Sequence, residues 1–194
     1  MKKSIILFFA ALLAALSATA AVLQHQQRDL SGKMIRLHVV ANSDSEEDQA
    51  LKLCVRDAVL EVTKDVKDKQ ALPQYLPKIR QAAQQCLRAN GSSDQVVVTL
   101  QKEHFPTRIY DNFALPAGVY TALRVTIGEG EGHNWWCVAF PSICFRATAS
   151  DLEQAAQAGG FTQSEIGLIT EEGSGYELKF KALEWLDQLK RKLF

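Results

Sequence analysis

The most apolar part of the chain lies at its N-terminus. Lys2 and Lys3 precede an uninterrupted apolar run, Ile5–Leu16, and small residues follow at 18–21. A basic start, a short apolar core and an Ala-x-Ala pattern are typical of a secretory signal peptide. The run has 12 residues, whereas a permanent transmembrane helix needs roughly 20. We therefore predict that residues 1–21 are a signal peptide and that the protein is exported.

The residues after this segment leave one alternative open. Val22 and Leu23 would lengthen the apolar run, so an uncleaved N-terminal anchor is the other interpretation. The stretch that follows is polar and aperiodic, and we interpret residues 22–33 as a short linker. Residues 34–194 then form a single domain of ordinary size.

The domain begins with a strand pattern and two helical patterns. Residues 34–40 alternate apolar and polar before becoming fully apolar, which predicts a first strand. Ser43 and Glu46 have capping-box spacing at the start of a helix. Two apolar stripes of helical period follow and predict a helical hairpin, which ends at Asn90-Gly91. The stripes are Leu51, Cys54, Val55, Ala58, Val59 and Val62, then Leu76, Ile79, Ala83, Cys86 and Leu87.

The second half of the chain changes to a strand period. Strand patterns occupy residues 96–100, 120–127, 135–140 and, more briefly, 143–145. The sequence Gly-Glu-Gly-Glu-Gly at 128–132 predicts a hairpin loop, and helical patterns return at 151–158 and 176–194. The order predicts an α+β fold with a mostly antiparallel sheet, an N-terminal helical hairpin insertion and a C-terminal amphipathic helix.

Composition narrows the possible partners. The chain has 22 Lys and Arg residues against 22 Asp and Glu residues, so its formal net charge is zero. A balanced chain without a basic block does not predict a nucleic-acid partner. No second apolar segment of membrane length occurs. We expect membrane contact only through the signal peptide or the C-terminal helix.

Four cysteines in an exported chain favour disulfides. Cys137 and Cys144 are symmetric about Phe140-Pro141, so a chain reversal there would place them at bridgeable separation. We predict a disulfide between them. Cys54 and Cys86 sit on the two predicted helices of the hairpin, whose axes normally lie about 8–10 Å apart. A disulfide and two buried free thiols both remain open for this pair.

The sequence carries no recognisable catalytic motif. Neither a nucleophile elbow nor the common zinc motif occurs, and the four histidines are scattered. The glycine-rich run at 128–132 lacks the Lys, Ser or Thr of a phosphate loop and precedes a strand. We predict no catalytic, cofactor-binding or metal site. A dispersed hydrolase site using Cys137 near His133 is the alternative.

Aromatic residues concentrate between residues 105 and 145, which is typical of interface anchors. Trp135 and Trp136 are adjacent, and neighbours on a strand point to opposite faces. One of them must then meet a second layer or lie exposed. A sheet core with turns is the alternative interpretation. The predicted partner-binding residues are Tyr110, Asn112, Leu115, Pro116, Gly118, Tyr120, Asn134, Trp135 and Trp136.

Four segments together resemble the stage II sporulation protein R family. They are residues 35–45, Phe105-Pro106-Thr107, residues 115–120, and the Asn-Trp-Trp-Cys block at 134–141 with Cys144-Phe145. The resemblance runs in order from about Met34 to Phe145. Residues 147–194 match no motif of the family.

The resemblance implies a signalling role rather than an enzymatic one. Proteins of this family are made in the forespore and exported between the two septal membranes. There they trigger a membrane-embedded aspartic protease, from its extracytoplasmic side, to cleave the precursor of sigma-E. Two other classes remain as alternatives: an exported hydrolase, and an envelope structural module whose last helix lies on the membrane.

Overall fold

The structure of the chain is a computed structural model. It describes residues 2–110, 113–143 and 149–170, with five further positions: 180, 181, 184, 185 and 188. The helices are α1 (Lys2–Lys33), α2 (Glu46–Thr63), α3 (Leu72–Ala89), α4 (Ala149–Ala158) and α5 (Gln163–Thr170), and η1 (Lys69–Ala71) is a 3-10 helix. The strands are β1 (Ile35–Val40), β2 (Val96–Phe105), β3 (Arg108–Ile109), β4 (Ala114–Leu115), β5 (Gly118–Ile127) and β6 (Asn134–Phe140).

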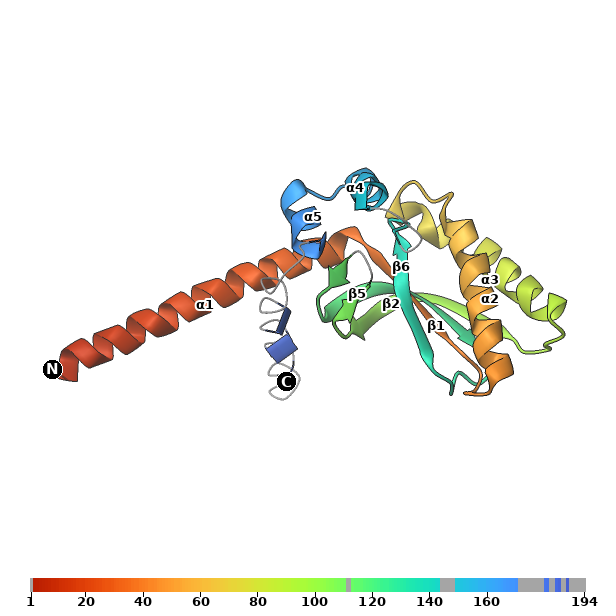
Figure 1. Cartoon of the computed structure of the whole chain (residues 1–194), viewed down its shortest axis with the longest axis horizontal. Coiled ribbons are helices and arrows are strands. Elements are labelled where there is room, and N and C mark those ends of the chain that lie inside the picture. The colour runs from red at the N-terminus through yellow and green to blue at the C-terminus, as the bar shows by residue number, and fades with distance from the viewer. Residues whose placement is uncertain are drawn as a thin grey trace.

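Four strands form the central sheet in the order β2-β5-β1-β6. β1 runs parallel to β5, whereas the β1–β6 and β2–β5 pairs are antiparallel. Helices α2 and α3 pack together on one side of this sheet, and α1 projects away from the domain (Figure 1). The predicted α+β class is confirmed, with a mixed sheet in which two of three pairings are antiparallel.

The prediction of a hairpin at residues 128–132 was wrong. β5 and β6 are consecutive in sequence, but β1 lies between them. The loop therefore crosses over the end of β1, where Glu131 N donates to Asn42 O at 3.0 Å and Gly132 N donates to Ala41 O at 3.0 Å. Alternation of apolar residues identifies a strand but not its neighbour, and the parallel β1–β5 pairing left no sequence signal.

The helical hairpin is confirmed, with small changes at its ends. Ser45, not Ser43, caps α2, and its side chain accepts a hydrogen bond from Asp48 N. Ser43 instead donates its hydroxyl to Asp48 Oδ2 at 2.6 Å. The apolar stripes of α2 and α3 meet one face of the sheet, which we call the helix face. Its buried core includes Leu37, Val39, Val55, Val59, Ile79, Ala83, Leu87, Leu123 and Val125.

The opposite face, which we call the concave face, has its own core. It is covered in part by the end of α1, the β3–β4 ribbon, α4 and α5. Helix α5 was not predicted from the sequence, although its Ile166 and Ile169 are buried in this core. Ile143 lies outside any described strand. Residues 144 and 145 fall outside the described residues, so the short strand at 143–145 stays a prediction.

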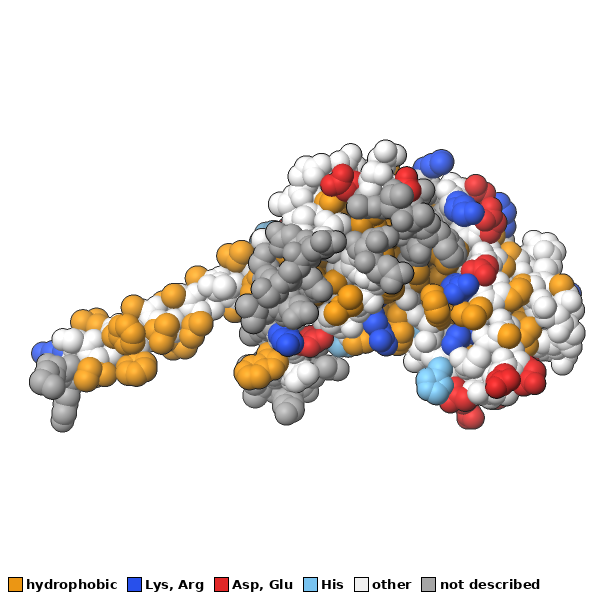
Figure 2. Space-filling view, viewed as in Figure 1, with side chains coloured by type: hydrophobic (Ala, Val, Ile, Leu, Met, Phe, Trp, Pro, Cys, Tyr) orange, Lys and Arg blue, Asp and Glu red, His pale blue; other side chains and the backbone are white. Residues whose placement is uncertain are grey.

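Residues 22–33 are helical and continue α1, in contrast to the irregular linker that we expected. Tertiary packing stabilises this stretch, because Leu30 and Met34 are buried in the concave-face core. Farther out, apolar side chains cover the projecting part of α1 (Figure 2). In the described part of the chain α1 alone is long and apolar enough to cross a membrane, a test that signal sequences also pass.

The predicted C-terminal helix at 176–194 lies mostly outside the described residues. The five described positions after residue 170 are helical. Among them Phe180 is buried and belongs to a small cluster with Ala114, on which Leu23 of α1 also packs. Leu23 of α1 and this C-terminal position therefore belong to one cluster.

Candidate functional site

The concave face brings the two edge strands of the sheet together. β2 and β6 lie at opposite edges, yet the rings of Phe105 and Trp136 meet edge to face with centroids 4.8 Å apart. A twisted sheet coils, and here the coil closes the far end of β2 over β1 and β6. The result is a small aromatic and polar cluster, which we call the concave-face cluster. It consists of Arg36, His38, Glu103, Phe105, Tyr110, Tyr120, Arg124 and Trp136.

His38 is the centre of the polar part of this cluster. His38 as a whole is only 4 % exposed, and its ring stacks on Trp136 with centroids 3.8 Å apart. Nδ1 of His38 lies 2.8 Å from Glu103 Oε2. The other carboxylate oxygen of Glu103 accepts a hydrogen bond from Arg124 Nη1 at 3.1 Å. Glu103 therefore links three strands, because His38 is on β1 and Arg124 is on β5.

The pKa of Glu103 is lowered from its ordinary value of 4.5 by these partners. Burial raises this pKa, but hydrogen bonds from His38, Gln101 and Arg124 outweigh burial. A carboxyl group whose pKa falls on folding stabilises the native state above its unfolded-state pKa. That stabilisation is lost as the pH falls through the folded-state pKa.

Glu103→Gln should therefore change how the free energy of unfolding depends on pH. Wild type should exceed the variant in stability at pH 7. The gap should start to shrink below pH about 4.5, where this carboxyl group protonates in the unfolded state, and it should close as the pH falls through the lowered pKa of Glu103 in the folded state. Urea unfolding of both proteins between pH 3 and pH 7 measures this gap. A gap that stays constant over the range would contradict the assigned role of Glu103.

Arg36 is a fully buried cation on the same face. Its Nε donates to Cys137 O at 3.0 Å and its Nη2 donates to Tyr110 Oη at 3.0 Å. The guanidinium lies over Phe105, 4.4 Å from the ring centroid, and near Tyr120. No carboxylate among the described residues forms an ion pair with Arg36, so aromatic faces and neutral oxygens hold its charge.

Four of the predicted partner-binding residues support this cluster from inside. Leu115, Pro116, Gly118 and Tyr120 are buried, because the β3–β4 ribbon folds onto β5. Tyr120 donates its hydroxyl to Pro116 O at 2.6 Å, and burial raises the pKa of Tyr120 to about 12. A Cβ at Gly118 would collide with the Gln27 side chain of α1. These four residues therefore lie beneath the surface around Trp136 and are not exposed on it.

The other predicted residues lie at or near the surface. Trp136 and Tyr110 are half-buried, and Tyr110 donates its hydroxyl to Trp136 O at 3.1 Å. Asn134 is exposed. Trp135 points to the helix face, as adjacent strand residues must, and its ring lies 4.5 Å from the Arg56 guanidinium. Asn112 falls outside the described residues.

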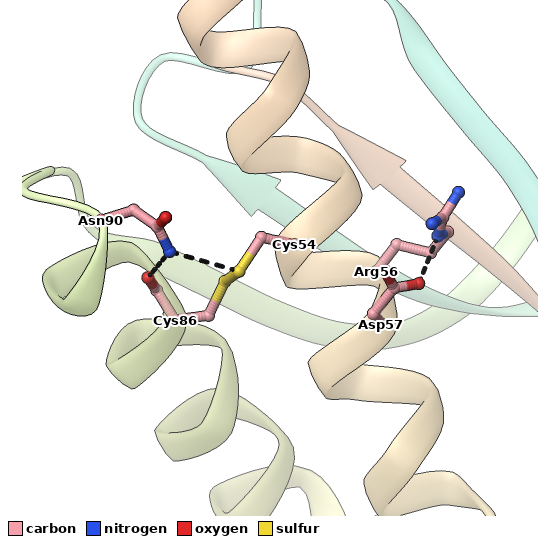
Figure 3. Close-up of a disulfide and its surroundings, with 5 residues drawn as sticks. All are labelled: Cys54, Arg56, Asp57, Cys86 and Asn90. Atoms are coloured by element: carbon pink, nitrogen blue, oxygen red, sulfur yellow. Dashed lines mark hydrogen bonds and ion pairs between the residues drawn. A yellow bond between two sulfur atoms is a disulfide. The ribbon is translucent and has the colours of Figure 1, made fainter.

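A disulfide joins Cys54 of α2 to Cys86 of α3 (Figure 3). Their Cα atoms are 6.4 Å apart, within the range that a disulfide spans. Asn90 Nδ2 donates to Cys86 O at 2.8 Å and to Cys54 Sγ at 3.5 Å. Of the two interpretations left open by the sequence, the disulfide is the one observed. The predicted partner of Cys137, Cys144, lies outside the described residues, so that pairing stays a prediction.

The geometry does not assemble the alternative hydrolase site. Cys137 is buried on the helix face of β6, whereas His133 is exposed and pairs with Asp44. Within the described ranges no three His, Cys, Asp or Glu side chains are placed to hold a metal ion. The residues that the sequence reasoning missed are Arg36, His38, Glu103 and Arg124. The alternation of side chains along β1 could have indicated Arg36 and His38, since both lie on the face of the sheet opposite Leu37.

These features define a class of protein: an α+β domain that follows an N-terminal apolar helix typical of a signal sequence. The profile of the stage II sporulation protein R family matches residues 31–150. A stage II sporulation protein R from Bacillus subtilis (strain 168) is 33 % identical over 198 aligned positions, which cover 88 % of this chain and 88 % of that protein. No solved structure matches the chain. The chain belongs to the stage II sporulation protein R family and has a role in sporulation.

Proposed function

We propose that this protein is an exported signal of sporulation that activates a membrane-embedded aspartic protease. The protease then processes the precursor of sigma-E, and the catalytic acid belongs to the protease rather than to this chain. Family membership over residues 31–150 is the observation that carries the proposal. The resemblance of the Asn-Trp-Trp-Cys block supports it.

The proposed location is the space between the two membranes of the sporulation septum, after export from the forespore. The apolar helix near the N-terminus supports export. The Cys54–Cys86 disulfide supports it too, because disulfides persist mainly outside the reducing cytosol. In this location the domain faces the extracytoplasmic side of its partner.

We propose that the partner docks on the surface around Trp136, with Asn134 and Tyr110. Trp136 is half-buried and Asn134 is exposed, so both are within reach of a partner. Tryptophans in such positions are frequent binding hot spots, and loss of one costs about 2 kcal/mol or more, roughly a thirtyfold loss of affinity. Trp135 lies on the other face and provides the matched control.

Co-expression in a non-sporulating host tests the proposal. The host carries the candidate protease, the sigma-E precursor and this protein, and precursor cleavage is measured. Wild type should trigger cleavage, whereas a protein lacking residues 1–20 should not, because it stays on the wrong side of the membrane. Trp136→Ala should trigger far less cleavage than Trp135→Ala at equal exported amounts. Absence of cleavage with wild type would refute the proposed function.

A further inference from the structure

The edge strand β2 exposes the backbone of alternate residues. In the described part of the chain β2 pairs only with β5, through ten residue pairs without a register shift. Gln95 O accepts a hydrogen bond from Gly128 N at 2.9 Å, toward β5. Val96 N instead donates to the side chain of Gln84 at 3.1 Å, away from β5. Backbone N–H and C=O groups point to alternate sides along a strand. The N–H and C=O groups of the even-numbered residues of β2 therefore point away from β5, toward the open edge of the sheet.

Three of these outward residues offer unpaired backbone groups. Within the described part of the chain, no hydrogen bond reaches the outer side of Val98, Leu100 or Lys102. They span about 14 Å of strand, since four residues of antiparallel strand rise roughly 3.4 Å each. The strand contains no proline, and no bulge interrupts it. Such an edge is a template for a further strand unless the protein protects it.

A groove lies between α3 and the start of β2, next to this edge. It has a volume of about 520 Å³ and is lined by Pro77, Arg80, Gln81, Gln84, Gln85 and Arg88 of α3 with Gln95 and Val96. The lining contains two arginines and no carboxylate. Arg80 and Arg88 are exposed, and neither forms an ion pair with a described residue. Lys102 is a third exposed cation, and its side chain lies on the same face of the sheet as α3.

We propose that β2 and α3 bind an extended, acidic segment of a partner protein as a fifth strand. The segment would pair with Val98, Leu100 and Lys102 through its backbone. Its Asp or Glu side chains would lie along Arg80, Arg88 and Lys102. Strand addition beside a helix is an established mode of peptide recognition, with backbone bonds giving affinity and alternate side chains giving specificity.

The positive charges of Arg80, Arg88 and Lys102 favour an acidic partner segment over a second copy of this chain at the edge of β2. If two copies of this chain paired through β2, each would bring its own arginines and lysine to the junction. Like charges opposite one another destabilise such a pairing. A segment that carries carboxylates has the complementary charge. The inference rests on the proposed function only for the identity of the partner, which would then be the protease.

The proposal is tested on the exported protein with the peptide acetyl-(Glu-Val)₃-amide and its lysine counterpart. Amide hydrogen exchange at Val98, Leu100 and Lys102 should slow by at least about tenfold with the acidic peptide and not with the basic one. Lys102→Pro should abolish the protection, because proline removes an outward N–H at a position where an edge strand tolerates it. Lys102→Ala keeps that N–H and should retain protection at all three positions.

Several results of the peptide experiment would overturn the proposal. Equal or absent protection with the two peptides overturns the proposal, as does protection that rises with protein concentration alone, which would indicate self-pairing. Gln101→Pro, whose N–H points toward β5, should melt earlier than Lys102→Pro; the reverse order would overturn the assigned strand orientation. In co-expression, a fully active Lys102→Pro would show that the segment is not the protease's. Failure of wild type to trigger cleavage, with peptide protection intact, would remove the proposed function alone.

Discussion

Replacing Cys54 and Cys86 together with alanine should lower the free energy of unfolding by about 3–4 kcal/mol. The disulfide closes a loop with a sequence separation of 32 residues, and the loop-entropy relation gives a loss of that size when such a cross-link is removed. The effect should appear as a lower urea midpoint of the exported protein, measured without reductant. The helical hairpin should still form, because its apolar stripes pack on the sheet independently of the sulfur atoms.

Asn90→Ala is the matched control for this pair. It removes the hydrogen bonds to Cys86 O and Cys54 Sγ (Figure 3) but leaves the covalent link. We expect a loss of only about 0.5–1.5 kcal/mol, the usual net contribution of a hydrogen bond. If the double alanine variant and Asn90→Ala lose the same free energy of unfolding, the covalent link itself does not stabilise the fold.

Phe105→Ala should destabilise the protein by about 3–5 kcal/mol, the range for truncation of a buried phenylalanine. The Phe105 ring is fully buried and touches Trp136, Tyr120 and the Arg36 guanidinium. Its removal leaves a cavity beside a buried cation, so both packing and cation–π contacts are lost. Thermal melts and urea unfolding of the exported protein measure the effect.

Val97→Ala, on the same strand, distinguishes core packing from a general weakness of β2. Val97 is 56 % exposed, and surface substitutions usually change stability by less than about 0.5 kcal/mol. The near-UV circular dichroism of Phe105→Ala should also change, because Trp136 loses its edge-to-face neighbour. A small effect of Phe105→Ala, similar to that of Val97→Ala, would mean that the coil of the sheet does not depend on this ring.

Much of the fold could be predicted from local patterns. The strands at 35–40, 118–127 and 134–140 and the helical hairpin agree with the apolar periods, because burial on one face selects those periods directly. The neighbours of each strand could not be predicted. Inserting β1 between β5 and β6 depends on contacts between residues about 85 positions apart or more, such as Ile35 with Thr121 and with Phe140, and no local pattern records them.

The site was less accessible to sequence reasoning. The opposite orientations of Trp135 and Trp136 followed from strand geometry alone. The sequence did not predict that Arg36 and His38 are buried, because polar and charged residues on a strand normally indicate a solvated face. Here the coiled sheet and the β3–β4 ribbon bury both side chains. Residues 22–33 were expected to be a linker because their composition is polar. Their helix is stabilised by the packing of Leu30 in the concave-face core and of Leu23 against Ala114 and Phe180.

The contact between Phe105 and Trp136 also connects the two edge strands of the sheet, β2 and β6, directly. Across the strands, a disturbance at β2 would have to pass through β5 and β1 before it reached β6. Through the rings, the end of β2 and the tryptophan of β6 are direct neighbours. A strand added along β2 and a partner docked at Trp136 would therefore be coupled through the Phe105–Trp136 contact and through His38, which pairs with Glu103 of β2 and stacks on Trp136. The sheet is therefore partly closed on itself, because side chains of its two edge strands are in direct contact.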